Sequence, residues 1–276
     1  MMTVAQKVYS TEWAGNAEAY AKQGLYERLA DHLLANGRIS SVMDVGCGLG
    51  HGLRSLRDKI APAPFRLLGI DENPDCLSAA AAILALEGIG ANIDRMQSEM
   101  LPSGFYRWRY NPGELQTGSA ITLVQSNLLV HDPALGALLT RQASFDAVIL
   151  WFIGVHKATA NTELARHFEI KGDADYRELV EDAVIEMAKS ALRPNGLLHV
   201  AVRGGFPSSD EATAHTRSQY EPYFVDQGFR LKSIKAIPYI EPQEAAAIVV
   251  RSASAPQIDA LPAYAVSMIG QKRNPS

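Results

Sequence analysis

A short apolar run that breaks into alternating glycines constrains this chain more than any other feature. Val42, Met43 and Val45 form the run, and glycine then takes every second position from 46 to 52. The run predicts a strand buried in a parallel sheet, and the return of apolar residues at helical spacing after residue 52 predicts a helix. A strand followed by a glycine turn and a helix predicts a nucleotide-binding crevice. Glycine lets the backbone approach a ligand closely, and the N-terminus of the helix offers free N–H groups.

The spacing of these glycines discriminates between nucleotides. A dinucleotide site needs the pattern G-x-G-x-x-G, but His51 takes the third position when the pattern starts at Gly46, and Leu53 takes it when the pattern starts at Gly48. The phosphate-loop string G-x-x-x-x-G-K-[ST] does not occur. On the glycines alone, a plain tight turn stays open as the alternative.

An acidic residue follows the next apolar run. Residues 65–70 predict a second strand, which ends at Asp71. A carboxylate at the tip of the strand after a glycine loop suits a ribose diol, since its two oxygens accept from two hydroxyls. The alternative role of Asp71 is to cap the helix that Asn73, Pro74 and Asp75 predict, and the two roles are compatible.

The first glycine motif resembles that of the class I S-adenosylmethionine (SAM) methyltransferases, D-x-G-x-G-x-G, through Asp44, Gly46, Gly48 and Gly50. The resemblance covers residues 40–250 and includes a turn over 193–197 that is similar to the family's L-K-P-G-G-x-L junction. It implies a doubly wound, mostly parallel α/β sheet of seven strands, with helices on both faces and an antiparallel last strand. It also implies SAM as cofactor, S-adenosylhomocysteine (SAH) as product, and no metal.

The resemblance also assigns roles to residues. The glycine loop would hold the methionyl part of SAM, Asp71 the ribose, and Asn127 with Leu128 the adenine, while Asp44 would brace the loop or reach the methionyl amine. Asn127 stands where the family usually carries an acid, and its side-chain oxygen can still accept a hydrogen bond. The complete predicted cofactor site is Asp44, Gly46, Cys47, Gly48, Gly50, Asp71, Glu72, Asn127, Leu128 and Trp151.

Aromatic residues outside the crevice are the candidates for binding the methyl acceptor. Trp13 and Tyr20 belong, with Tyr9, to a predicted N-terminal segment of aromatics, which could cover the cofactor or substrate or simply pack on the sheet edge. Tyr106 and Trp108 share one face of a strand predicted over 105–110, with Arg107 and Arg109 on the other. This segment could be a flap that stacks a ligand or a half-buried strand whose arginines are only solvated.

His156 is the candidate catalytic residue and a further substrate contact. It follows the fourth predicted strand, residues 145–151, at the carboxyl edge where open α/β sheets place their reaction. An imidazole could take a proton from a hydroxyl or amine as it attacks the SAM methyl group. The alternative is a histidine with no chemical role.

Composition excludes several classes of function. The 276 residues carry 26 basic and 30 acidic side chains, a net charge of −4, which provides no overall field to attract nucleic acid or an anionic membrane. Two cysteines without a C-x-x-C pair argue against a disulfide scaffold and a zinc site. Without an apolar run near 18 residues or a signal-peptide core, we expect a cytoplasmic protein.

The patterns divide the chain into a helical lid over 1–38, a SAM-binding domain over 39–251 with an insertion at 91–120, and a tail over 252–276. The last strand is expected at 245–251, and the tail could lie on the surface or exchange with a second copy in a homodimer. We expect methyl transfer to a hydroxyl or amine of a small molecule. The alternatives are an RNA or protein methyltransferase that uses the 105–110 strip, and a non-catalytic SAM-binding regulatory or scaffold subunit.

Overall fold

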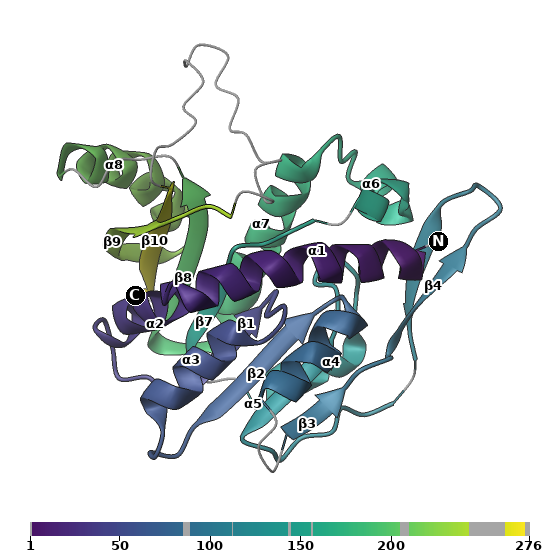
Figure 1. Ribbon diagram of the computed structural model, residues 1–276, viewed down its shortest axis with the longest axis horizontal. Coiled ribbons are helices and arrows are strands. Elements are labelled where there is room, and N and C mark those ends of the chain that lie inside the picture. The colour runs from purple at the N-terminus through teal and green to yellow at the C-terminus, as the bar shows by residue number, and fades with distance from the viewer. Residues whose placement is uncertain are drawn as a thin grey trace.

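The computed structural model describes residues 2–84, 89–111, 113–142, 145–155, 157–204, 210–242 and 263–273. Its centre is a sheet with the strand order β3-β6-β2-β1-β7-β8-β10-β9 (Figure 1). The strands are β1 (Ser41–Val45), β2 (Arg66–Asp71), β3 (Ile89–Asn92), β6 (Ile121–Gln125), β7 (Phe145–Trp151), β8 (Leu192–Gly204), β9 (Phe229–Tyr239) and β10 (Ala263–Lys272).

The pairing of these strands confirms the predicted fold. β1 lies between β2 and β7 in parallel register, β6 pairs with β2, and β8 pairs with β7, all parallel. β10 runs antiparallel to both β8 and β9. The strands from β6 to β9 therefore form the mostly parallel sheet with an antiparallel last strand that the resemblance implies, and β3 adds a parallel strand beside β6.

The antiparallel strand β10 lies in a segment that was expected to be a tail. β10 lies inside the segment 252–276, which the sequence analysis assigned to a tail. Its residues 265–270 are buried, and it lies between β8 and β9 in the sheet. The tail prediction is therefore wrong for this part of the segment, which is a core strand. The three prolines that suggested a tail, at 256, 262 and 275, all lie outside the strand, so none interrupts its hydrogen bonds. The strand predicted over 245–251 lies outside the described residues.

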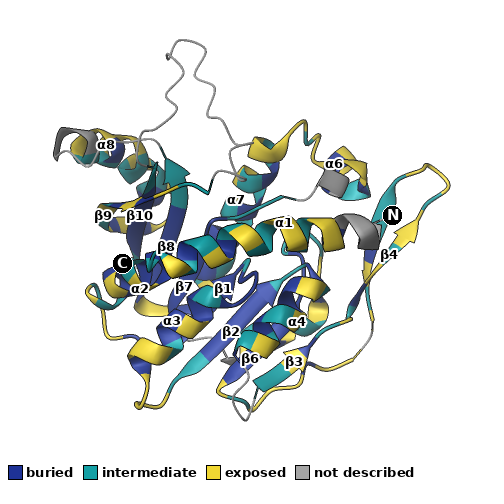
Figure 2. Cartoon of the chain, in the orientation of Figure 1, coloured by how far each residue is buried: buried dark blue, intermediate teal, exposed yellow. Residues whose placement is uncertain are grey.

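Helices cover both faces of the sheet, because alternate strand residues point to opposite sides. Val42 packs with the helices of one face and its neighbour Met43 with those of the other. Figure 2 shows the buried strands between helices whose outer surfaces are exposed. On the first face lie α1 (Met2–Lys22), α2 (Leu25–Leu34), α3 (His51–Ile60) and α4 (Pro74–Ile83), and on the second lie α5 (Pro133–Gln142), α7 (Asp173–Ala191) and α8 (Asp210–Asp226).

The insertion at 91–120 contains an antiparallel hairpin that projects from the body beside the N-terminus (Figure 1). Its strands are β4 (Met96–Met100) and β5 (Tyr106–Tyr110). A short 3-10 helix, η1 (Lys157–Asn161), and α6 (Glu163–His167) pack near the hairpin and α1. Among the helices that the structure describes, none combines the length and the apolar character that crossing a membrane requires.

Candidate functional site

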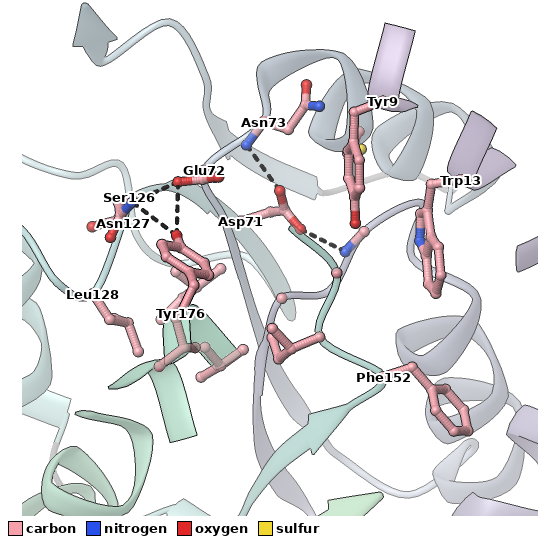
Figure 3. Close-up of a pocket in the computed structure, with 18 residues that line it drawn as sticks. Tyr9, Trp13, Asp71, Glu72, Asn73, Ser126, Asn127, Leu128, Phe152 and Tyr176 are labelled. Atoms are coloured by element: carbon pink, nitrogen blue, oxygen red, sulfur yellow. Dashed lines mark hydrogen bonds between the residues drawn. The ribbon is translucent and has the colours of Figure 1, made fainter. Parts of the chain in front are cut away.

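A cavity lies at the carboxyl edge of the sheet, where β1, β2, β6 and β7 end (Figure 3). Six of the predicted cofactor residues line it, together with the predicted substrate residue Trp13. Those six are Gly46, Gly48, Asp71, Glu72, Asn127 and Leu128. Tyr9 of the N-terminal helix lines the cavity as well. So do residues that the sequence analysis did not assign to a site, among them Asn73, Ser126, Phe152, Gly154 and Tyr176.

The glycine turn after β1 is bent tightly over the end of β2. The backbone N–H groups of Gly46 and Cys47 both donate to the carbonyl oxygen of Ile70, at 2.8 and 3.0 Å. Gly46 has φ +70°, and a Cβ there would come 2.5 Å from Ile153 Cδ1, so no other residue fits without a rearrangement. The turn therefore brings bare backbone to the edge of the cavity.

Asp71 faces this turn. Its Oδ2 accepts a hydrogen bond from the Gly48 N–H at 2.9 Å, and its Oδ1 accepts from the Asn73 N–H at 2.8 Å (Figure 3). The helix cap that was the alternative role of Asp71 belongs to Asn73, whose side chain accepts from the N–H of Asp75. The two N–H groups hold the carboxylate at the tip of β2, directly beside the glycine turn.

A second polar group occupies the β6 side of the cavity. Asn127 donates through Nδ2 to Glu72 Oε2 at 2.5 Å and accepts through Oδ1 from the Leu129 N–H at 2.9 Å. The hydroxyl of Tyr176, from α7, donates to the same Glu72 oxygen at 3.4 Å. Glu72 is thus drawn across the cavity edge towards Asn127, as Figure 3 shows.

Four predicted cofactor residues lie beneath the cavity surface. Cys47, Gly50 and Trp151 do not line the cavity, and Trp151 is buried with its ring 5.2 Å from that of His199. Side chains alternate along β7, and Trp151 points to the side of the sheet that α1–α4 cover. Asp44 is buried at the end of β1, where burial and the neighbouring Asp71 raise the pKa of its carboxyl well above the ordinary value.

The N-terminal helix crosses the cavity. The parallel rings of Tyr9 and Trp13 lie 6.5 Å apart on one face of α1, and both line the cavity. Asn73 ties the helix down by donating through Nδ2 to the backbone oxygen of Gln6 at 2.9 Å. Tyr20, about two helical turns after Trp13, is fully buried outside the cavity, and its hydroxyl donates to Glu241 Oε1 at 2.8 Å.

The hairpin residues lie apart from this cavity. Trp108 is buried against Met96, and Tyr106 packs against the same pair, while Arg107 and Arg109 both contact Glu99. Trp108 lines a separate cavity under the hairpin. The hairpin contacts the main site through Tyr110, whose hydroxyl accepts from the Asn127 N–H at 2.9 Å. His156, the predicted catalytic residue, lies outside the described residues.

The charges at the cavity favour a cationic ligand. Two carboxylates, those of Asp71 and Glu72, line it, and no lysine, arginine or histidine does so in the part of the chain that the structure describes. No group of three or more histidine, cysteine or acidic side chains suited to a metal ion is found within the described residues.

No protein-family model and no curated protein matches the chain. The partner of the Trm112 methyltransferase activator in a Haloferax volcanii complex is 15% identical, with 96% of each chain covered and a TM-score of 0.49. The SAM-dependent methyltransferase of Methanosarcina mazei is 12% identical, with 88% of this chain and 97% of that chain covered and a TM-score of 0.47.

A third similar structure was determined with a nucleoside ligand. The N-methyltransferase NodS of Bradyrhizobium japonicum WM9, in complex with SAH, is 12% identical, with 92% of this chain and 88% of that chain covered and a TM-score of 0.46. Methyltransferases are therefore among the solved structures similar to this chain. Identities this low and TM-scores below 0.5 leave the site to be interpreted from its own geometry.

Two aromatic residues that line the cavity differ in how far the sequence reveals them. Tyr9 stands four residues before Trp13, so one helical turn places both rings on one face, and this spacing is visible in the sequence. Tyr176 fits the apolar period of α7 and reads as a core residue, because nothing local shows that its hydroxyl reaches Glu72. The second kind of residue is found only once the helix is docked.

Proposed function

We propose that this protein is a SAM-dependent methyltransferase that transfers a methyl group to a hydroxyl or amine of a small molecule. The observation that carries the proposal is the Asp71 carboxylate held beside the glycine turn by the Gly48 N–H, at the tips of adjacent strands. A carboxylate in that place suits a ribose diol, and the bare turn suits an amino-acid end that carries no phosphate. The acidic lining suits the positive charges of a sulfonium and an ammonium group.

The chain's own residues then have distinct tasks. Gly46 and Gly48 would hold the methionyl part, Asp71 the ribose, and Asn127 with Leu128 and Glu72 the adenine. When bound, SAM supplies an electrophilic methyl group for an in-line displacement, so positioning accounts for much of the rate. Tyr9 and Trp13 lie across the cavity and would exclude water from the reacting atoms.

Tyr9 is suited to donate a hydrogen bond rather than to accept a proton. Burial and then the charge of Asp71 raise the pKa of its hydroxyl, so it stays protonated at neutral pH. A donor in this place can orient an acceptor oxygen or nitrogen. The proton-accepting role of His156 and the acceptor contacts of Tyr20, Tyr106 and Trp108 stay predictions.

The hairpin contacts bear on the RNA or protein alternative. Both arginines of the 105–110 strip contact the single carboxylate of Glu99, so the strip keeps one net positive charge. Trp108 is buried, so its ring offers no free surface on which a base could stack. This favours the small-molecule acceptor.

Calorimetry with SAM, SAH and NAD tests the proposal. We expect SAM and SAH to bind and NAD not to bind. Asp71→Asn keeps the shape but removes the charge, so the affinity for SAH should fall by about 10- to 100-fold, the range for a charge-assisted hydrogen bond. Asp58→Asn, an exposed acid on α3, is the matched control and should leave the affinity unchanged.

Two results would contradict the proposal. Failure of the wild-type protein to bind SAH would remove the cofactor assignment, and so would an Asp71→Asn variant with full affinity. Tight SAH binding without methylation of any compound in an extract would instead support the non-catalytic subunit.

A further inference from the structure

Two apolar side chains of the chain itself cover the glycine turn on its cavity side. Trp13 of α1 lies over Gly48, where a Cβ would come 3.1 Å from its Nε1. Ile153, which follows β7, lies over Gly46, where a Cβ would come 2.5 Å from its Cδ1. A Cβ is one bond away from its Cα, so both side chains contact the backbone of the turn. All four residues line the cavity.

The space left beside the turn is too small for the proposed cofactor. The cavity has a volume of about 80 Å³, whereas pockets that bind cofactors and drug-sized ligands have about 300 to 1,000 Å³. In the proposed function the methionyl part of SAM lies against Gly46 and Gly48. Trp13 and Ile153 occupy that place, so they have to move before SAM can bind there.

The part of α1 that carries Trp13 can move without disrupting the helix below it. Asn73 ties α1 down by donating through Nδ2 to the backbone oxygen of Gln6 at 2.9 Å. The other end of the same amide, Oδ1, caps α4 by accepting from the Asp75 N–H at 3.0 Å. Release of Gln6 therefore leaves the cap of α4 in place, and water can replace the hydrogen bond that is lost.

The residue before Ile153 is held in a strained conformation. Phe152 has φ +59°, which a bulky residue adopts only where its surroundings require it, and such strain clusters at switch regions. Its ring is anchored in the core against Tyr20 and Tyr26, at 5.7 and 6.4 Å between ring centres. A change of the backbone at Phe152 would relieve the strain and carry Ile153 off Gly46. The loop after β7 therefore has a hinge beside the site.

We propose that the protein closes its own donor site: Trp13 and Ile153 occupy the place of the methionyl group, and SAM enters only after both side chains have moved off the turn. This inference rests on the proposed function, because it concerns the same site. Binding is then limited by the fraction of molecules in which the turn is uncovered. Once SAM has entered, the return of α1 would cover it and exclude water.

The rate of SAH association tests this gating, since the homocysteine end of SAH needs the same place. Rapid filtration with tritium-labelled SAH measures the rate over a range of SAH concentrations. For the wild type we expect the observed rate to level off as SAH increases, because opening of the site becomes limiting. The association rate decides the question rather than the affinity, because removal of Trp13 also removes contacts with the bound ligand and speeds dissociation.

Variants from two different elements uncover the turn. Trp13→Ala and Ile153→Ala should each speed association, and together they should speed it by about 10-fold or more, the gain for a site open in at most about 10% of the molecules. Ile153→Phe enlarges the cover and should slow association. Asn73→Ser keeps a capping oxygen for α4 but loses the amide that holds Gln6, so it should speed association as well. Val8→Ala, at a residue of α1 that is 51% exposed, is the matched control and should keep the wild-type rate.

The outcomes separate this gating from the proposed function. Unchanged association in both Trp13→Ala and Ile153→Ala, or a wild-type rate that rises in proportion to SAH throughout, would overturn the gating while SAH still binds. An equal gain in Val8→Ala would overturn it too, because the effect would then come from a general loosening of α1. Absence of SAH binding to the wild type and to both uncovered variants would instead overturn the proposed function, and the gating with it.

Discussion

Gly154 offers the most direct test of how α1 closes the cavity. A Cβ at this position would overlap the Tyr9 hydroxyl and come 2.9 Å from Tyr9 Cζ. Its φ lies outside the left-handed range, so the backbone accepts alanine and the ring contact decides the outcome. Gly154→Ala should therefore push Tyr9 out of the cavity and loosen the first half of α1.

The magnitude follows from the area that Tyr9 would expose. Displacing the ring exposes on the order of 100 Å² of apolar surface, which at about 25 cal/mol per Å² lowers the free energy of unfolding by about 2 to 3 kcal/mol. Tyr9→Ala should cost about the same, because it removes the same contacts. In the Tyr9→Ala background the new methyl group meets nothing from that ring, so Gly154→Ala should then cost about zero.

Urea unfolding of the two single variants and the double variant measures this coupling. We expect the double variant to be about as stable as either single variant, a coupling of about 2 kcal/mol. Gly172→Ala is the control, since Gly172 has extended backbone and open space around the new Cβ. Additive effects would show that the loop at 154 gives way instead of α1, and would refute the lid interpretation.

Two pH effects follow from buried groups. Burial lowers the pKa of His32 to about 4 and that of His199 well below the ordinary value. As the pH drops, these histidines therefore become protonated in the unfolded chain before they do so in the folded protein. The free energy of unfolding should then fall between about pH 6.5 and pH 4, by about 1.4 kcal/mol per pH unit for each histidine. Denaturant titrations across this range check it, and a His32→Asn variant with the same pH slope as the wild type would contradict it. The raised pKa of Asp44 favours the protonated carboxyl in the free protein, whereas the ammonium group of SAH bound nearby would favour the ionised carboxylate. Binding of SAH should therefore release a proton from Asp44, and the affinity for SAH should increase as the pH rises. The difference between the binding enthalpies measured in phosphate and in Tris gives the number of protons released. An Asp44→Asn variant that releases as many protons as the wild type would show that Asp44 is not their source.

The sequence by itself determined the strand, the glycine turn and the acid at the next strand tip. These features are local: an apolar run marks a buried strand, and Gly46 is required by its own φ and by the closeness of Ile153. The parallel order then brings Asp71 beside Gly48 with no further information, because neighbouring parallel strands end at one edge.

Only the tertiary structure decided which side chains fill the space above that edge. Tyr9 arrives from α1 and Tyr176 from α7, more than 160 residues apart, and both positions depend on how helices dock rather than on local pattern. Residues 263–272 were assigned to a tail for the same reason: they form an apolar run like other strands, and only pairing with β8 and β9 shows that they are a core strand. Backbone preferences act over a few residues, whereas the convergence of side chains depends on packing across the whole sheet.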